Sequence, residues 1–227
     1  MRNFRALALF SVFLLLQATF SYSVGDIFPK ISNLPKNVSG SALKLLEFGD
    51  SQFLYRLLSQ KIQMAGDSYG RATKLEEYDY DVLDKWLYQI NALDNKSNYL
   101  PSIAAYLYGN SNNNGDLIKI INYLKSHWQN TGGKNWWWLT QAIYIAKHKI
   151  KDLPLALDLA IKLNSTDKII IPEWAKTLPL IILAVMGEHE AAMQVVQKII
   201  DQPDITDQEL NFINYFLEER LQSLGKN

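Results

Sequence analysis

The side chains best suited to chemistry in this sequence are five closely spaced carboxylates, Glu76, Glu77, Asp79, Asp81 and Asp84. Two carboxylates on opposite sides of a bond can hydrolyse a glycoside, one as general acid and the other as base or nucleophile. The same residues are also typical of a polar loop that leads into a helix N-terminus, where negative side chains face exposed amides. We favour the second interpretation and keep a carboxylate-based glycan hydrolase as the alternative.

The three histidines, His127, His148 and His189, do not form a metal-binding pattern. None lies four residues from another, which is the spacing that brings two imidazoles to one metal on a helix. The sequence also lacks a glycine-rich phosphate-binding loop. We therefore expect no metal, no cofactor and no enzymatic activity.

Trp136, Trp137 and Trp138 follow one another directly. Consecutive helical residues point about 100° apart, so three indoles cannot all face one core, and we expect at least one to be exposed. An exposed indole can anchor a peptide or a glycan, or rest at a membrane interface. For each individual tryptophan, packing between helices is the favoured interpretation.

The composition excludes several classes of protein. The 23 basic and 23 acidic residues cancel, so no strong field directs the chain to nucleic acid, and we expect no nucleic-acid partner. The absence of cysteine excludes disulfides, thiol nucleophiles and zinc–thiolate sites. Hydrophobic residues make up 48% of the chain, which is enough for one core or one continuous helical array.

The N-terminus has the pattern of an export signal. Arg2 and Arg5 precede an apolar run from Ala6 to Phe20, and Ser21-Tyr22-Ser23 offers small residues to a signal peptidase. We expect residues 1–23 to be a signal peptide cleaved after Ser23, with an uncleaved signal anchor and membrane tether as the alternative. The abundance of Asn, Lys and Ile is typical of an AT-rich bacterial genome, so we expect the body to lie in the periplasm, free or anchored to the inner membrane.

The elements that must position these residues are helices. Proline, glycine and polar residues dominate residues 24–49, which we expect to be a linker. From residue 50 onward, apolar residues recur every three or four positions, as in amphipathic helices. We expect Pro179 to kink one of these helices. The expected helices lie at 51–65, 80–93, 99–109, 116–129, 135–150, 153–163, 172–185, 188–200 and 206–221.

Two of the expected helix junctions resemble tetratricopeptide repeats. Met186-Gly187-Glu188-His189-Glu190-Ala191-Ala192 resembles the turn and second helix of such a repeat. Gly187 suits the left-handed end of one helix, and small alanines allow close helix crossing. Asp79-Tyr80-Asp81 and Leu93-Asp94-Asn95-Lys96-Ser97 resemble the entry and exit of another repeat, although Asn95 replaces proline and residues 67–78 form too long a turn.

The resemblance implies a fold and a binding face for residues 50–223. The fold would be an all-α, right-handed α-solenoid of about four irregular hairpins, closed by a C-terminal capping helix. In this family the first helix of each hairpin lines the concave face. By that register, four aromatic residues would bind a partner there, namely Tyr99, Tyr106, Trp138 and Trp174.

The fold class and the lack of catalytic residues together indicate a binding function. We expect a non-catalytic scaffold that binds a protein or peptide of the cell envelope. The alternative is a module that binds or hydrolyses cell-wall glycan, because exposed tryptophans and carboxylates suit sugar rings.

Overall fold

The computed structural model describes residues 2–24, 33–67, 72–165, 171–201 and 205–221, and every regular element in these ranges is helical. The expectation of an all-α protein is confirmed for the described residues. The chain divides into two compact units, residues 1–32 and residues 33–227.

The first unit contains one helix, α1 (Arg2–Val24). The window Ala6–Ser23 has a mean hydropathy of 1.6 over 18 residues, so α1 is long and apolar enough to cross a membrane, a property that N-terminal signal sequences share. The hydroxyls of Ser11, Thr19 and Ser23 donate hydrogen bonds to carbonyls one turn earlier in the same helix. These three hydroxyls are therefore satisfied within the helix, as a lipid environment requires.

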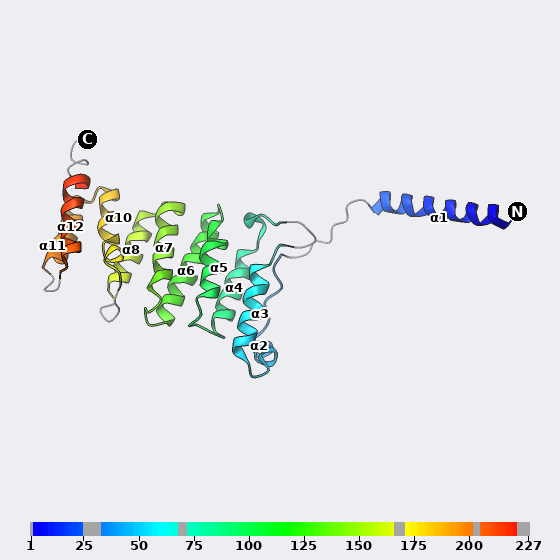
Figure 1. Ribbon diagram of the computed structural model, residues 1–227, viewed down its shortest axis with the longest axis horizontal. Coiled ribbons are helices and arrows are strands. Elements are labelled where there is room, and N and C mark those ends of the chain that lie inside the picture. The colour runs from blue at the N-terminus through cyan, green and yellow to red at the C-terminus, as the bar shows by residue number, and fades with distance from the viewer. Residues whose placement is uncertain (1, 25–32, 68–71, 166–170, 202–204, 222–227) are drawn as a thin grey trace. The chain divides into compact units, whose positions relative to one another are not determined.

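The second unit consists of helices that follow one another in chain order (Figure 1). From α2 to α11, each helix contacts its successor, and α3, α4 and α5 also contact the helix after that. The helices are α2 (Gly40–Glu47), α3 (Ser51–Gln63), α4 (Tyr80–Asn91), α5 (Tyr99–Tyr106), α6 (Asn114–Asn130), α7 (Trp136–Tyr144), α8 (Leu153–Asn164), α9 (Glu173–Lys176), α10 (Leu178–Met186), α11 (His189–Ile200) and α12 (Asp207–Tyr215). Short 3₁₀ helices lie at Leu75–Glu77 and Tyr108–Asn110. π-Helical turns lie at Ile145–Ile150 and Phe216–Leu221.

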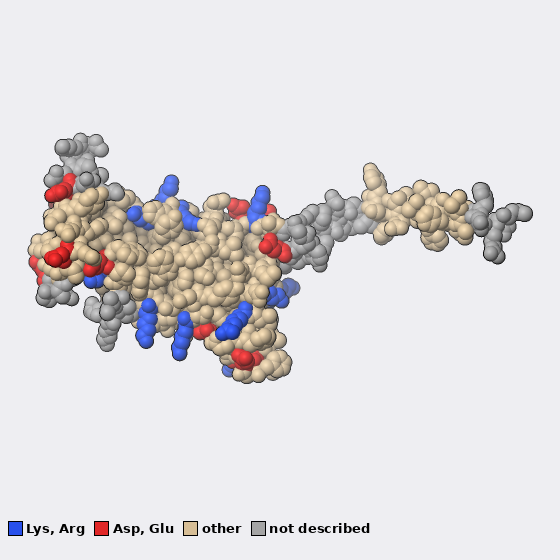
Figure 2. Space-filling view, viewed as in Figure 1, with Lys and Arg blue, Asp and Glu red and all other residues tan. Residues whose placement is uncertain are grey.

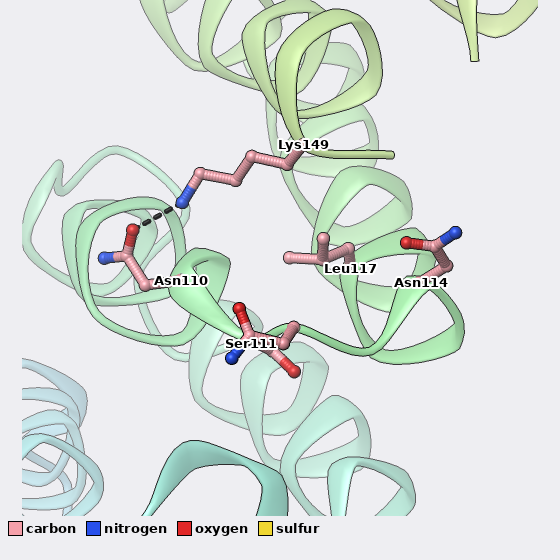
Figure 3. Close-up of a pocket in the computed structure, with 6 residues that line it drawn as sticks. Asn110, Ser111, Asn114, Leu117 and Lys149 are labelled. Atoms are coloured by element: carbon pink, nitrogen blue, oxygen red, sulfur yellow. Dashed lines mark hydrogen bonds between the residues drawn. The ribbon is translucent and has the colours of Figure 1, made fainter. Parts of the chain in front are cut away.

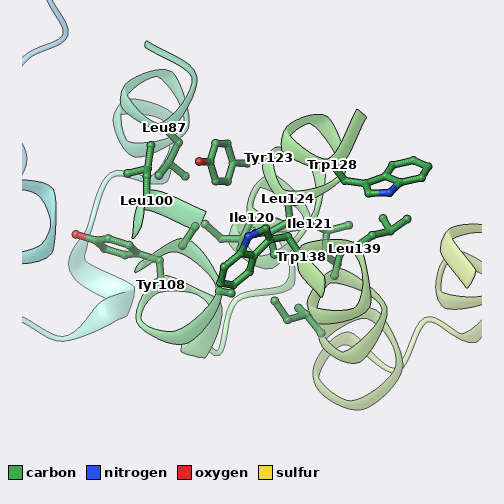
Figure 4. Close-up of a cluster of buried hydrophobic side chains, with 14 of the residues drawn as sticks. Leu87, Leu100, Tyr108, Ile120, Ile121, Tyr123, Leu124, Trp128, Trp138 and Leu139 are labelled. Carbon is green, nitrogen blue, oxygen red and sulfur yellow. The ribbon is translucent and has the colours of Figure 1, made fainter. Parts of the chain in front are cut away.

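The core of this unit is continuous from Leu34 to Ile182, with a smaller cluster between α10 and the C-terminal helices. Leu157 of α8 packs against both clusters. Figure 4 shows the part of the main cluster where leucines and isoleucines of α6 meet Tyr108, Tyr123 and Trp138. Apolar residues at helical spacing form these faces, as the sequence pattern predicted.

Residues 33–49 are not a linker, which corrects the expectation for residues 24–49. Leu34 is buried, and the Trp86 indole donates to the Pro35 carbonyl at 2.8 Å. The Gln89 amide donates to the Val38 carbonyl at 2.7 Å. Residues 33–38 pack on α4 in a non-helical conformation, which has no helical periodicity for a sequence pattern to reveal, and residues 40–47 form the helix α2. Residues 25–32 lie outside the described residues.

Several helix ends match their sequence signals and others differ. Gly187 ends α10 with a φ of 78°, and the Glu188 amide donates to the Leu183 carbonyl at 3.0 Å, as in a Schellman motif. Asn113 caps α6 by accepting hydrogen bonds from the amides of Gly115 and Asp116, so the helix begins at Asn114 and not at the expected residue 116. Around Pro179 the structure has two helices, α9 and α10, in place of one kinked helix.

Two tyrosine hydroxyls donate hydrogen bonds to backbone carbonyls at the C-terminal end of α3. Tyr108 is fully buried, and its hydroxyl donates to the Ile62 carbonyl at 2.7 Å. The Tyr78 hydroxyl donates to the Ala65 carbonyl, and the two tyrosine rings meet edge to face at 5.5 Å. These bonds satisfy carbonyls that a helix end leaves without intrahelical partners. They also join the end of the long turn between α3 and α4 to the core.

Candidate functional site

Five aromatic residues from three helices meet at one place on the second unit. We call Tyr106 of α5, Trp136, Trp137 and Trp138 of α7, and Trp174 of α9 the aromatic cluster. Their rings meet mainly edge to face: the centroid distances are 5.9 Å for Tyr106–Trp138, 5.8 Å for both Trp136–Trp137 and Trp136–Trp174, and 6.2 Å for Trp137–Trp174. Such geometry is the favourable one for aromatic pairs. The rings therefore support one another in fixed orientations.

The cluster has a buried side and an exposed side. Tyr106, Trp137 and Trp174 expose 52%, 41% and 48% of their surfaces, whereas Trp136 is half-buried and Trp138 exposes only 5%. The helical rotation of about 100° per residue distributes the three consecutive indoles in this way. The prediction that at least one of them is exposed is confirmed.

Hydrogen bonds fix two of the indoles. The Trp137 indole donates to the Tyr106 hydroxyl at 2.8 Å, and the Trp138 indole donates to the Asn98 side-chain carbonyl at 2.9 Å. Because both indole N–H groups are engaged within the protein, a ligand would contact ring faces and edges of Trp137. The exposed part of the cluster is therefore an apolar surface with a defined shape.

The structure brings together three of the four predicted binding residues and corrects the role of one. Tyr106, Trp138 and Trp174 belong to the cluster, but Trp138 is part of the core and cannot contact a partner. Tyr99 lies two helical turns from Tyr106 on α5, and its hydroxyl donates to the Gln63 side chain.

Trp137 is the exposed indole that the sequence-based register missed. Sequence reasoning placed Trp138 on the binding face, one residue out of phase with the structure. The error arises because α7 begins directly at Trp136, after a turn in which Gly132 and Gly133 have φ values of 62° and 83°. A run of three tryptophans signals that one is exposed but does not say which.

The acidic residues act as structural partners of nearby groups. Asp79 caps α4 by accepting from the amides of Asp81 and Val82. Asp81 forms an ion pair of 2.8 Å with Lys119, and this hydrogen-bonded cation lowers the pKa of the Asp81 carboxyl. Glu76 accepts a hydrogen bond from Asn112 at 2.7 Å. These contacts match the expected loop and helix N-terminus, and they supply no opposed pair across a cleft.

Asp84 is the carboxyl in this group whose pKa is raised, because partial burial disfavours its charged form. Neighbouring lysines act against this shift. A raised pKa suits a general acid, but such an acid also needs a second carboxylate across a substrate-sized space. The described pocket of this unit contains no carboxylate in its lining.

His127 is a buried, neutral core residue. Its Nδ1 lies 2.7 Å from the Asn91 side-chain oxygen, and its Nε2 lies 3.2 Å from the Asn135 side-chain nitrogen. Burial lowers the pKa of His127 to about 4. Among the described residues, no group of three His, Cys, Asp or Glu side chains is placed to hold a metal ion.

A polar pocket of about 370 Å³ lies between the Tyr108–Asn110 turn and the start of α6 (Figure 3). Its lining residues are Asn110, Ser111, Asn112, Asn114, Leu117 and Lys149. The Lys149 ammonium donates to the Gly109 carbonyl at 2.7 Å and to the Asn110 side chain. Lys149 is the single cation of the lining, and its ammonium is already hydrogen-bonded within the protein. Desolvation lowers the pKa of Lys149. The pocket suits a small polar molecule and contains no nucleophile–base pair.

The chain also contains two serine patterns that occur in hydrolases. Gly66–Gly70 reads Gly-Asp-Ser-Tyr-Gly, a pattern that hydrolases place on a turn between a strand and a helix. Here Gly66 follows α3, and Ser68 lies outside the described residues. Ser41 precedes Lys44 by three residues on α2, but its hydroxyl pairs with Ser39 at 3.0 Å. The Ser41 hydroxyl is thus paired with a serine and not with Lys44.

Comparison of the chain with protein-family models, curated proteins and solved structures found no match. The functional interpretation therefore depends on the aromatic cluster and on the helices that carry it.

Proposed function

We propose that this protein is an exported, non-catalytic scaffold that binds an envelope protein or peptide through the aromatic cluster. The observation that carries the proposal is the exposure of Tyr106, Trp137 and Trp174 on a surface whose rings are held by one another. Large aromatic residues with restricted side chains are typical binding hot spots, because they contribute much contact area at low entropic cost.

The helix arrangement supports a tetratricopeptide-like solenoid. Each helix from α2 to α11 contacts its successor, and contacts also join α3 to α5, α4 to α6 and α5 to α7. Hairpins stacked in one direction produce this pattern of contacts. The aromatic cluster comes from α5, α7 and α9, which are the first helices of successive hairpins in such an array. We infer a right-handed solenoid with these helices on its binding face.

The chemistry of the cluster indicates the kind of partner. Its exposed rings offer apolar faces, so they suit an aliphatic, aromatic or cationic side chain of a peptide. The carboxylates of residues 76–84 are caps and ion-pair partners, which favours binding over hydrolysis. The periplasm, with or without a tether through residues 1–23, is the proposed location, because α1 has the properties of an export signal or an anchor.

Crosslinking in native cells tests this proposal. A C-terminally tagged full-length chain would be crosslinked and purified, and the captured proteins identified by mass spectrometry. We expect Trp137→Ala and Trp174→Ala to lose most of the captured partner. Tyr144→Ala removes an aromatic residue that is 52% exposed but outside the cluster, so it should retain the partner. Equal capture by all three variants would contradict the proposal.

Thermal unfolding of the same variants separates binding from stability. Trp138→Ala should destabilise the protein by about 3–5 kcal/mol, because it leaves a cavity in the core. Trp137→Ala should cost less, about 1–2 kcal/mol, because 41% of its surface is already exposed. If only unfolded variants fail to capture the partner, the result does not support the aromatic cluster as a binding site.

A glycan ligand is the second candidate, because exposed indoles also stack on sugar rings. Co-sedimentation with peptidoglycan distinguishes the two. If the unmodified protein pellets with peptidoglycan, Trp137→Ala does not, and crosslinking captures no protein, then the aromatic cluster binds glycan. Release of soluble fragments from the peptidoglycan would show that the protein also hydrolyses it.

A further inference from the structure

The polar pocket at the start of α6 contains a cation that is bonded only to neutral groups. Lys149 lies on the π-helical turn after α7, and its ammonium donates to the Gly109 carbonyl at 2.7 Å and to the side-chain oxygen of Asn110. The ion pairs among the described residues do not include Lys149. Because an ammonium has three N–H groups, one donor remains for a ligand.

Partial burial makes this charge unfavourable in the free protein. Lys149 is half-buried, and desolvation lowers the pKa of its ammonium. A negative group beside an ammonium favours the charged form and raises its pKa. An anionic ligand in the pocket would therefore stabilise the charge of Lys149, which no carboxylate of the described residues pairs with.

The turn that carries Lys149 is basic. Residues 145–152 contain three lysines, Lys147, Lys149 and Lys151, and one acid, Asp152. Asp152 is engaged as the cap of α8, because its side chain accepts from the Leu155 amide at 2.9 Å. Figure 2 shows basic side chains at the upper edge of the unit, over the end of α7. The local charge thus favours an anion, although the chain as a whole is neutral.

Two acids contact residues of the pocket lining, and both are hydrogen-bonded there. Glu76 accepts from the Asn112 side chain at 2.7 Å, and Asp116 accepts from the Ser111 hydroxyl at 3.3 Å. Neither carboxylate belongs to the lining itself. These bonds hold the loop between α5 and α6, so Lys149 is the charged group that a ligand in the pocket would meet.

The size and the lining of the pocket suit a small organic molecule. Its volume of about 370 Å³ lies at the lower end of the range of about 300–1,000 Å³ that is usual for small-molecule sites. The lining combines the side-chain amides of Asn110, Asn112 and Asn114 with one apolar side chain, Leu117. Amides can donate to and accept from hydroxyl or carbonyl groups, and Leu117 can contact carbon atoms.

We propose that this pocket binds a small organic anion, either a carboxylate or a phosphate ester, through a hydrogen bond from the Lys149 ammonium to an anionic oxygen. Such a charge-assisted bond is shorter and stronger than a bond between neutral groups. The aromatic cluster and the pocket share no residue, so this ligand is additional to the protein or peptide partner proposed above.

NMR titration of the full-length chain in a non-ionic detergent tests the proposal. The protein would carry ¹³C-labelled lysine, and the Lys149 signal would be assigned by its loss in Lys149→Gln. The probes are succinate and glycerol phosphate, each beside its neutral counterpart, succinamide or glycerol. We expect at least one anion to shift the Lys149 side-chain signal saturably and to raise the pKa of Lys149, whereas the neutral compounds leave both unchanged.

The variants Lys149→Gln and Lys151→Gln separate a specific site from a general effect of charge. Both remove one positive charge from the same turn, but Lys151 is exposed and outside the lining. Calorimetry with the anion that saturates should show binding about ten-fold weaker or more in Lys149→Gln, because a hydrogen bond to a charged group is lost. Lys151→Gln should weaken binding by less than about two-fold, because solvent and salt screen an exposed charge.

Saturation by succinate alone would identify the ligand as a carboxylate, and saturation by glycerol phosphate alone would identify a phosphate ester. Either result supports the site. The proposal is wrong if neither anion shifts the Lys149 signal saturably, if a neutral counterpart binds equally well, or if both variants weaken binding equally. Because the Lys149 signal is observed in the unmodified protein, the titration decides the question even if Lys149→Gln does not fold.

Discussion

At the scale of single residues, position within a helical turn decides whether a side chain binds or packs. Trp137 and Trp138 are chemically identical neighbours, yet one is 41% exposed and the other 5%. Rotation about the axis of α7 produces this difference. The exposure of His127 also depends on its position. Histidine is a surface residue in many helices, but His127 lies in the core between Asn91 and Asn135.

The pH dependence of stability should depend on His127. Its pKa falls from 6.5 in the unfolded chain to about 4 in the folded protein, because burial disfavours the imidazolium. Between these values the unfolded chain binds more protons, so stability is lost as the pH falls through this range. The total loss is about 3 kcal/mol for a shift of this size. Denaturant unfolding at several pH values measures it.

The variant His127→Gln isolates this effect from the carboxylates that titrate in the same range. It should be less stable than the natural protein at neutral pH but lose less stability on acidification. A direct reading comes from the NMR titration of the His127 imidazole. An NMR pKa near 6.5 would contradict the buried, neutral assignment.

At the scale of the elements, the turn between α3 and α4 shows how an irregular segment is held. Its described residues return to the end of α3 through the Tyr78 hydroxyl and through Thr73, whose hydroxyl donates to the Gly66 carbonyl at 2.9 Å. This turn breaks the spacing of a regular repeat. Its contacts show that residues 72–78 pack against the preceding helix.

Replacing Gly66 should be far more costly than replacing Gly187. Both have positive φ values, 83° and 78°, so alanine strains the backbone by about 1 kcal/mol at either position. A Cβ at Gly66 would lie 1.9 Å from the Tyr78 hydroxyl, whereas a Cβ at Gly187 meets no atom within 4 Å. Displacing Tyr78 adds about 1–3 kcal/mol, which is the usual cost of overpacking.

Chemical denaturation of Gly66→Ala and Gly187→Ala measures this difference directly, with Gly187→Ala as the control for backbone strain. The expected losses are about 2–4 and about 1 kcal/mol. Equal losses would mean that Tyr78 moves aside without cost and that the turn is loosely held.

At the scale of the whole molecule, the fate of α1 decides whether the protein is released or tethered. The expected cleavage site Ser21–Ser23 lies within the continuous helix α1, and the Ser23 hydroxyl donates to the Thr19 carbonyl at 2.7 Å. The length and hydropathy of α1 suit both a cleaved signal peptide and a membrane anchor.

We expect the protein from native cells to lack residues 1–23, as the signal-peptide pattern of the sequence predicts, and to be released from the membrane fraction. Intact-mass measurement of a C-terminally tagged chain checks this expectation. A mass that includes residues 1–23 would contradict the expected cleavage and would support the signal anchor.

The sequence by itself determined the helical class, most helix positions and the presence of an N-terminal apolar helix. These properties follow from local rules: apolar periodicity places helices, Asp79 and Gly187 mark their ends, and hydropathy marks α1. Such signals are readable because each depends on residues close together in the chain.

Only the tertiary structure decided which aromatic residues are exposed and which segments pack on the core. Trp137 became the exposed indole because α7 begins at Trp136 and meets α5 and α9 at a particular rotation. Residues 33–38 joined the core through bonds from Trp86 and Gln89, which lie about fifty residues away in the chain. The physical reason is that burial depends on contacts between distant segments, and local periodicity carries no information about them.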